Sequence, residues 1–128
     1  MREVLFRAKG KDDGKWVYGW YCRYTFGKWP LKDAIIPSEE AESGCHRFVE
    51  VDQSTVGQYT GLLDKNGKRI FEGDLLVLAT SRAHEVKFAD GSFYMEGTTF
   101  PFYYGRKFTI VGNRWDNPEL LGEVSDNG

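Results

Sequence analysis

The chain has 128 residues, with 17 lysines and arginines against 19 aspartates and glutamates, giving a formal net charge of -2. This length suits one domain, or two small ones that share a core, and excludes a doubly wound nucleotide enzyme or a (β/α)₈ barrel. The near-neutral charge gives no general attraction to phosphate backbones, so nucleic-acid binding would need a local patch. Aromatic residues make up 16% of the chain, and such rings favour pleated surfaces, which predicts a β-rich protein.

The sequence favours a protein of the cytoplasm. No apolar run approaches the roughly 20 residues that cross a bilayer. The N-terminal segment carries charge inside its apolar part and lacks a small-residue cleavage site, so we expect no signal peptide. The two cysteines, Cys22 and Cys45, are then expected to be reduced thiols, although their spacing also permits a disulfide.

Short apolar and aromatic runs alternate with turn residues in the N-terminal half, which is typical of β-strands. We expect strands over residues 3–9, 16–22, 34–36 and 46–51. Asp13-Gly14 suits the tight turn between the first two strands. Both faces of the strand at 16–22 carry bulky side chains, so we expect it to be covered on both sides. The polar stretch 38–44 is either one helical turn capped by Ser38 or a loop.

The C-terminal half has clearer strand and turn signals. We expect a short strand or a bend over residues 56–61, and strands over 75–80, 85–89, 92–96 and 107–111. Asn-Gly at 66–67 and Asp-Gly at 90–91 predict hairpin turns. A proline near the start of 116–121 suits a short helical turn, and 122–128 is expected to be a flexible, frayed tail.

Strands joined by tight turns in this half predict a small SH3-like barrel, because closing the sheet removes exposed edges and a few inward side chains fill the interior. The predicted fold is mainly β. An N-terminal β segment over residues 1–55 packs on a C-terminal SH3-like barrel over 56–121, followed by the tail at 122–128. The side chains expected to face the barrel interior are Leu76, Leu78, Val86, Phe88, Phe93 and Ile110.

Three ordered motifs span most of the chain. The first is FRAK at 6–9 followed by GKWVYG at 14–19. The second is TVGQYTGL at 55–62 followed by DKNGKRIFEGD at 64–74, and the third is IVGN at 110–113 followed by DNPELL at 116–121. Together they resemble the signature of the YopX family of phage and prophage proteins.

The resemblance carries limited functional information. It implies a C-terminal region similar to SH3-type barrels, a phage or prophage origin, and action in the cytoplasm of a bacterial host. The biochemical role of the family is not established, and its pattern holds no catalytic residues that could be carried over to this chain.

The signature residues also have a direct physical interpretation, in which the motif specifies the fold. We expect the chain to bend or to take positive φ at Gly57, Gly61, Gly67 and Gly73. Asp64 is expected to accept hydrogen bonds from the amides of its own turn, and Asp74 to do the same at a strand entrance. Tyr59 and Phe71 are expected to cover one end of the barrel.

Patterns for metal binding and for nucleophilic catalysis are weak. Cys45 and His46 are adjacent, and neighbours in an extended chain point apart, so they do not readily share one ion. Cys22 and His84 form no second paired motif, and no group at recognisable spacing would orient a Cys–His nucleophile. No Gly-rich loop with the spacing of a phosphate cradle is present either. We therefore expect no metal, no cofactor and no catalytic residue.

The sharpest enzymatic hypothesis is a metal-dependent nuclease. Asp74 followed by Glu85-Val86-Lys87 resembles the carboxylate and Glu-x-Lys pattern of such enzymes. On a strand, Glu85 and Lys87 share a face, where they could hold a divalent ion and an attacking water. The alternative is an ordinary solvated strand face, because such triplets are common and the helix that usually frames the site is missing. We rank the nuclease third.

The segment 98–107 is the strongest candidate for a recognition surface, because it combines aromatic residues with two cations. Rings beside cations could stack bases and contact phosphate. Alternatively, the segment buries itself against the barrel or against a second copy, or it contacts another protein. The candidate residues are Phe100, Phe102, Tyr103, Tyr104, Arg106 and Lys107.

The first functional hypothesis is a non-enzymatic interaction module, accessory to phage replication, recombination or takeover of the host. It would bind a protein, or form a homo-oligomer, through the aromatic residues of 98–107. The alternative is a nucleic-acid-binding accessory factor that uses the same rings together with Arg106 and Lys107. Neither hypothesis includes a membrane or a small-molecule substrate.

Overall fold

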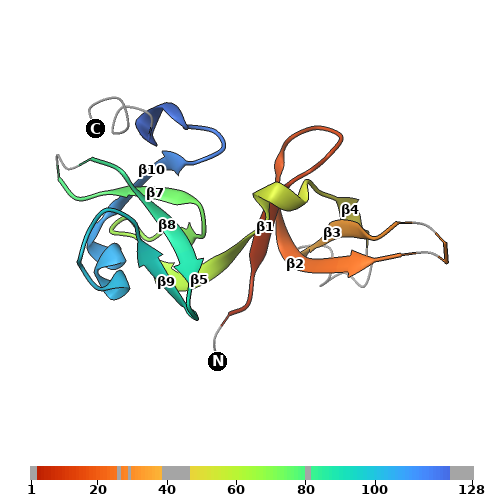
Figure 1. Cartoon of the computed structure of the whole chain (residues 1–128), viewed down its shortest axis with the longest axis horizontal. Helices are drawn as coiled ribbons and strands as arrows, with labels where there is room; N and C mark the ends of the chain where they lie inside the picture. The colour runs from red at the N-terminus through yellow and green to blue at the C-terminus, as the bar shows by residue number, and fades with distance from the viewer. Residues whose placement is uncertain (1–2, 26, 29, 39–46, 80–81, 122–128) are drawn as a thin grey trace. The chain divides into compact units, whose positions relative to one another are not determined.

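The computed structural model describes residues 3–25, 27–28, 30–38, 47–79 and 82–121. The chain divides into two compact units, Met1–Gln58 (unit 1) and Tyr59–Gly128 (unit 2). The described strands form one six-stranded and one four-stranded antiparallel sheet, which confirms the mainly β prediction (Figure 1). Within the described ranges, no helix combines the length and the apolar character that a membrane span requires.

The larger sheet has the strand order β4-β3-β2-β1-β5-β6. Its strands are β1 (Phe6–Lys9), β2 (Trp16–Tyr24), β3 (Lys32–Pro37), β4 (Val49–Glu50), β5 (Gly57–Leu63) and β6 (Arg69–Phe71). The start of β5 pairs with β1, where Gln58 lies opposite Phe6, and its later part pairs with β6, where Tyr59 lies opposite Phe71. One strand therefore belongs to the sheet pairing of both units. The predicted helical turn or loop at 38–44, together with Cys45 and His46, falls largely outside the described residues.

One face of the unit 1 sheet carries the core of this unit. Ala8, Ile35 and Val51 are fully or almost fully buried, and partly buried side chains from β1, β2 and β4 pack against them. A single 3₁₀ turn, η1 (Gln53–Thr55), leads into β5, and Thr55 Oγ1 accepts a hydrogen bond from the Lys9 N–H at 2.8 Å. This bond joins η1 to the end of β1.

Gly19 lets β2 and β3 approach each other closely. A Cβ atom at this position would lie 2.0 Å from the backbone oxygen of Ile36 and 2.9 Å from Cα of Pro37. These neighbours are backbone atoms of the paired strand, so they have no room to move aside. Only glycine therefore suits this point of the sheet.

The side chains on the opposite face of β2 are more exposed than predicted. We expected the strand to be covered on both sides, but Tyr18 is 43% exposed and Trp20 is 50% exposed. Val17 and Tyr21, which alternate with them, pack against the unit 1 core. The prediction was wrong because bulky side chains on both faces do not by themselves supply a second layer of protein.

The four-stranded sheet lies in unit 2 and has the order β10-β7-β8-β9. Its strands are β7 (Asp74–Val77), β8 (His84–Ala89), β9 (Ser92–Met95) and β10 (Thr109–Asn113). A 3₁₀ helix, η2 (Phe102–Lys107), connects β9 to β10. The predicted helical turn near the C-terminus is confirmed by i→i+3 bonds, since Leu120 N–H donates to Asn117 O and Leu121 N–H to Pro118 O.

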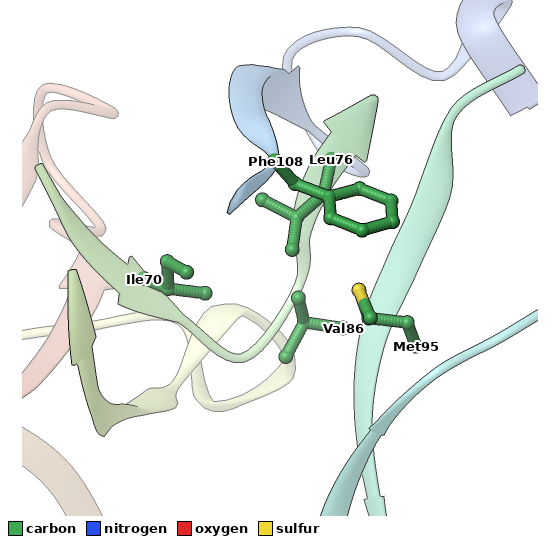
Figure 2. Packing of buried hydrophobic residues seen from close by; sticks show 5 residues of the cluster. All are labelled: Ile70, Leu76, Val86, Met95 and Phe108. Carbon is green, nitrogen blue, oxygen red and sulfur yellow. The ribbon is translucent and has the colours of Figure 1, made fainter. Parts of the chain in front are cut away.

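The core of unit 2 is apolar and fully buried. Figure 2 shows its side chains, which are Ile70, Leu76, Val86, Met95 and Phe108. The predicted inward positions of Leu76 and Val86 are confirmed, and Phe93 and Ile110 pack against this core while remaining partly exposed.

Two further inward predictions were wrong. Leu78 is 36% exposed and lies just beyond β7, which ends at Val77. Phe88 is 50% exposed, although it follows Val86 on the same face of β8. Phe88 lies close to the Asp90-Gly91 hairpin turn, beyond the part of β8 that packs on the core. The alternation of apolar and polar residues shows only which side chains share a face of a strand. The prediction therefore extended the core too far along β8.

The closed barrel was not found. Among the described strands, no pairing joins the ends of the four-stranded sheet, and β5 and β6 pair with each other and with β1. The physical reason is that β5 and β6, which lie within the predicted barrel region 56–121, pair in the six-stranded sheet and not with the four-stranded one.

Candidate interaction surface

The hairpin turn of the central motif is organised by the carboxylate of Asp64. Its Oδ1 accepts hydrogen bonds from the N–H groups of Asn66 and Lys68, both at 2.8 Å. Its Oδ2 accepts a bond from the Ile110 N–H at 3.1 Å. Burial alone raises the pKa of Asp64, but the three backbone donors outweigh burial and hold the pKa below its ordinary value of 3.8. The predicted turn bonds are confirmed, while the bond to β10 was not predicted.

Asp74 also accepts a hydrogen bond from a backbone N–H, at the entrance of β7. Its Oδ2 accepts a 2.7 Å hydrogen bond from the buried N–H of Phe71. The neighbouring Gly73 has a φ of +92, and a Cβ atom there would lie 2.3 Å from Cζ3 of Trp115. Gly61 and Gly67 also have positive φ, as predicted, whereas Gly57 is the first residue of β5.

The last motif forms a compact hydrogen-bonded turn around Asn113. The Asn113 Oδ1 accepts bonds from the N–H groups of Trp115 at 3.0 Å and Asp116 at 2.9 Å. In return, Asn117 Oδ1 accepts the Asn113 N–H at 3.2 Å. The second and third motifs thus place their polar side chains in turns of unit 2, which supports the interpretation that the signature specifies the fold.

The segment 98–107 is anchored to unit 2 through η2. Phe102 and Tyr104 pack against the buried core, and Gly105 is itself buried. A Cβ atom at Gly105 would lie 3.5 Å from Cδ1 of Ile70 and 3.7 Å from Cδ1 of Leu76. Because η2 lies at van der Waals distance from the core, its position is set by packing.

Other rings of the same segment remain exposed. Phe100 is 46% exposed and Tyr103 is 54% exposed. Phe100 stacks on Tyr104, with ring centroids 5.3 Å apart and an interplanar angle of 17°. Tyr103 meets the edge of the same ring, with centroids 4.9 Å apart. One anchored ring therefore supports two exposed rings.

The two cations at the end of η2 lie over tyrosine rings. Lys107 Nζ is 5.1 Å from the ring centroid of Tyr104, and Arg106 Cζ is 6.0 Å from that of Tyr103. These distances are within the range of cation–π attraction. The structure thus brings all six candidate residues into one local element. We call this set, Phe100, Phe102, Tyr103, Tyr104, Arg106 and Lys107, the η2 surface.

Sequence reasoning missed an extension of this surface along the β8–β9 hairpin. Phe93 meets Phe102 with ring centroids 5.9 Å apart, and Phe88 meets Phe93 with centroids 5.0 Å apart. Phe88 and Phe93 are directly paired across the hairpin. The alternation that placed both rings on one face was the available signal, but it was assigned to the barrel interior.

The three residues of the nuclease hypothesis are each engaged with other groups. Asp74 bonds the Phe71 amide, and the buried Glu85 pairs with Arg114, whose Nη1 is 3.2 Å from Glu85 Oε2. Lys87 Nζ lies 2.7 Å from Glu96, and this hydrogen bond raises the pKa of the lysine. Among the described residues, no three His, Cys, Asp or Glu side chains gather into a set that could hold a metal ion.

The candidate thiol and imidazole lie in different units. Cys22 is half-buried on β2, and burial raises the pKa of its thiol, which disfavours the nucleophilic thiolate. His84 is buried on β8, and its Nδ1 lies 2.9 Å from the backbone oxygen of Glu96. The partners considered with them, Cys45 and His46, lie outside the described residues.

Comparison with known proteins assigns the chain to a class. The two antiparallel sheets define a mainly β protein, and the YopX protein family matches residues 5–122. The chain belongs to the YopX family, as the three motifs indicated. It is also similar to a solved structure, the crystal structure of protein EF1440 from Enterococcus faecalis, with 26% sequence identity and a TM-score of 0.61. The match covers 94% of this chain and 99% of that one. No curated protein sequence matches the chain.

Proposed function

We propose that this protein is a non-enzymatic interaction module of phage or prophage origin that binds a protein partner in the bacterial cytoplasm through the η2 surface. The observation that carries this proposal is the contrast within one short element. Phe102 and Tyr104 are anchored on the core, while Phe100 and Tyr103 stay about half exposed. Large rings left exposed on an anchored element favour association, because little side-chain freedom remains to be lost.

The composition of the η2 surface supports a protein partner. Aromatic residues and arginine are the side chains that contribute most to protein–protein affinity. The extension through Phe93 to Phe88 enlarges the apolar area available next to η2. A homo-oligomer formed through this surface is the self-associating form of the same proposal.

The nucleic-acid alternative through the same segment has weaker support. Arg106 and Lys107 could contact phosphate, but a base stacking on Tyr104 would compete with Phe100, which is already stacked there. Stacking of free bases needs an open ring face. This arrangement favours a protein partner over a nucleic acid at the η2 surface.

A non-enzymatic role is also supported by the engagement of the best catalytic candidates. Asp74 and Glu85 each bind another group of the fold, and both are buried. A nuclease would need to release them before they could bind a divalent ion.

We also infer that unit 2 is an SH3-like domain whose sheet is not closed into a barrel. In place of some of the missing strand pairing, the turn that contains Asp64 bonds to the chain around β10. Lys65 N–H donates to Phe108 O at 2.9 Å, and Ile110 N–H donates to Asp64 Oδ2 at 3.1 Å. Both bonds bring the Asp64 turn against β10, which is an outer strand of its sheet. Covering an outer strand in this way reduces its tendency to pair with other chains.

The proposal is tested by capturing partners with the full-length chain from prophage-induced host cells, and by measuring its mass by light scattering. The Phe100→Ser/Tyr103→Ser variant should lose the captured partner, or the higher mass if the chain self-associates. Tyr94→Ala is the matched control, because Tyr94 is an exposed ring on β9 that lies outside the η2 surface.

The contact should also persist as salt rises, because it is mainly apolar, whereas phosphate-mediated binding would weaken steeply. The proposal is overturned if the double variant captures the same proteins and has the same mass as the wild type.

A further inference from the structure

The two cations of the η2 surface are not neutralised by any carboxylate in the described part of the chain. Arg106 and Lys107 are both exposed, and no aspartate or glutamate occurs in residues 97–113. Their contacts are with the rings of Tyr103 and Tyr104, which carry no net charge. The ion pairs of unit 2 that the structure describes involve other cations, on β8 and just after β10.

The Asp64 turn adds a third cation next to them. Lys65 N–H donates to Phe108 O at 2.9 Å, and Phe108 directly follows Lys107 in the chain. Lys65 is exposed. The adjacent Asp64 is only 5% exposed, and its carboxylate accepts three backbone hydrogen bonds, so this negative charge is held inside the fold. We call Lys65, Arg106 and Lys107 the basic rim of the η2 surface.

The exposed rings beside the basic rim do not form a parallel platform. Phe100 lies 17° from the plane of Tyr104, whereas Tyr103 is inclined by 66° to the same plane. Phe100 and Tyr103 are therefore steeply inclined to each other. Successive unpaired bases bind by stacking on ring faces, which such an arrangement does not favour. An uneven apolar surface suits the side chains of a polypeptide better.

The charge of the surface also distinguishes a protein partner from a second copy of the chain. Two copies that meet through the same patch bring identical residues together, so three cations of one rim would face three of the other. One exposed carboxylate, Asp90, lies at the opposite end of the surface, two residues beyond Phe88. It does not balance the basic rim, so the charge favours a partner with excess negative charge.

We propose, on the basis of the proposed function, that the partner presents an acidic and apolar protein segment to the η2 surface. Carboxylates of this segment lie against the basic rim, and its apolar side chains pack on Phe100 and Tyr103. Opposite charges around an apolar contact select the correct partner and its orientation. The negative charge of Asp90 directs the acidic end of the segment away from Phe88 and towards η2.

The two parts of the surface should act on different rate constants. The cations of the basic rim are exposed to solvent and to salt, so they mainly accelerate the encounter with an acidic segment. The rings are excluded from water in the complex, so they mainly slow its dissociation. The complex should therefore persist at high salt while its formation becomes slower.

The first test selects binders of the full-length chain from a random peptide library displayed on yeast. We expect the enriched peptides to be rich in aspartate, glutamate and apolar residues. The Arg106→Glu/Lys107→Glu variant should lose this acidic preference. Lys15→Glu/Lys28→Glu is the matched control, because it changes the net charge equally at two exposed positions of unit 1, and it should select acidic peptides like the wild type.

The second test measures the kinetics of the most enriched peptide by surface plasmon resonance. At low salt, Arg106→Gln/Lys107→Gln should slow association about ten-fold and change dissociation less than about two-fold. This difference should shrink as salt rises, because the charges are screened. Phe100→Ser/Tyr103→Ser should instead accelerate dissociation.

The outcomes separate the acidic partner from the function on which it rests. If the Phe100→Ser/Tyr103→Ser variant loses its partner from host cells, but the enriched peptides have no acidic preference, the interaction module stands and the acidic segment is excluded. If no peptide is enriched, the acidic segment is likewise excluded. Oligothymidylate binding that is lost in Arg106→Gln/Lys107→Gln would assign the basic rim to a nucleic acid. A doubled mass that the same variant abolishes would assign it to a second copy.

Discussion

Asp64 and Ile110 are 46 residues apart in the sequence, yet the Ile110 N–H donates a 3.1 Å hydrogen bond to the Asp64 carboxylate. The other oxygen of the same carboxylate accepts both amide bonds that shape the Asn66-Gly67 turn. One side chain therefore connects the central motif of the family to the strand that begins the last motif. This connection explains why an aspartate and an Asn-Gly turn occur together in the signature.

Replacing Asp64 tests this connection. Asp64→Asn keeps the size of the side chain but removes its charge and one acceptor oxygen, so at least one partly buried N–H loses its partner. We expect the free energy of unfolding to fall by about 2 kcal/mol, measured by urea denaturation at neutral pH. Glu119→Gln, an exposed carboxylate of unit 2, is the control and should change stability little. Equal stabilities of both variants would contradict a structural role for Asp64.

The pH dependence of stability should reflect the same residue. The folded-state pKa of Asp64 lies below the ordinary value of 3.8, because three backbone donors stabilise its charged form. A lowered folded pKa contributes stability that is present above the unfolded pKa and is lost as pH falls through the folded one. We therefore expect the stability difference between the wild type and Asp64→Asn to shrink below about pH 3.8. An unchanged difference down to the acid transition would show that Asp64 has no lowered pKa.

Alkaline pH should destabilise unit 1 through Tyr21. Burial, together with its hydrogen bond to Asp33, raises the pKa of this phenol from 10.0 to about 12. A raised folded pKa contributes stability that is present below the unfolded pKa and is lost as pH rises through the folded one. Absorbance titration should therefore show one late-titrating phenol that is missing in Tyr21→Phe. If the wild type and the variant titrate alike above pH 10.0, this assignment is wrong.

Gly73 should tolerate alanine less well than Gly91 does. Both have positive φ, +92 and +84, but a Cβ atom at Gly91 would meet nothing within 4 Å, whereas at Gly73 it would overlap Trp115. Gly91→Ala should therefore lose about 1 kcal/mol through backbone strain alone, and Gly73→Ala about 3 kcal/mol, as thermal unfolding would show. Equal losses would indicate that Trp115 does not pack on Gly73.

Gly105 should accept alanine, although it is buried. Its Cβ atom would lie 3.5 Å or more from the nearest core atoms, which is ordinary van der Waals contact. Gly105 is not among the residues with positive φ. We expect Gly105→Ala to stabilise unit 2 by about 0.5 kcal/mol, because it restricts the unfolded chain, and to leave binding by the η2 surface intact. A loss above about 1 kcal/mol would show tighter packing of η2 than the structure describes.

Local chemistry made the turns and many of the strands predictable. Positive φ at Gly67 and Gly91 follows from Asn-Gly and Asp-Gly pairs, whose backbone conformation depends on adjacent residues alone. Alternation also predicted which side chains share a face, so the burial of Leu76 and Val86 could be expected. The six residues of the η2 surface were found because aromatic and basic residues cluster in ten consecutive positions, 98–107.

The sequence by itself determined the turns, the β character and the family of this protein, since these depend on short-range patterns and on ordered motifs. Only the tertiary structure decided that β5 joins β1 instead of closing a barrel, and that Asp64 reaches β10. It alone also decided that Trp20 and Phe88 remain exposed. The physical reason is that strand pairing and burial are set by contacts between distant segments. A period of two identifies the members of a face, but it carries no information on whether another layer covers them.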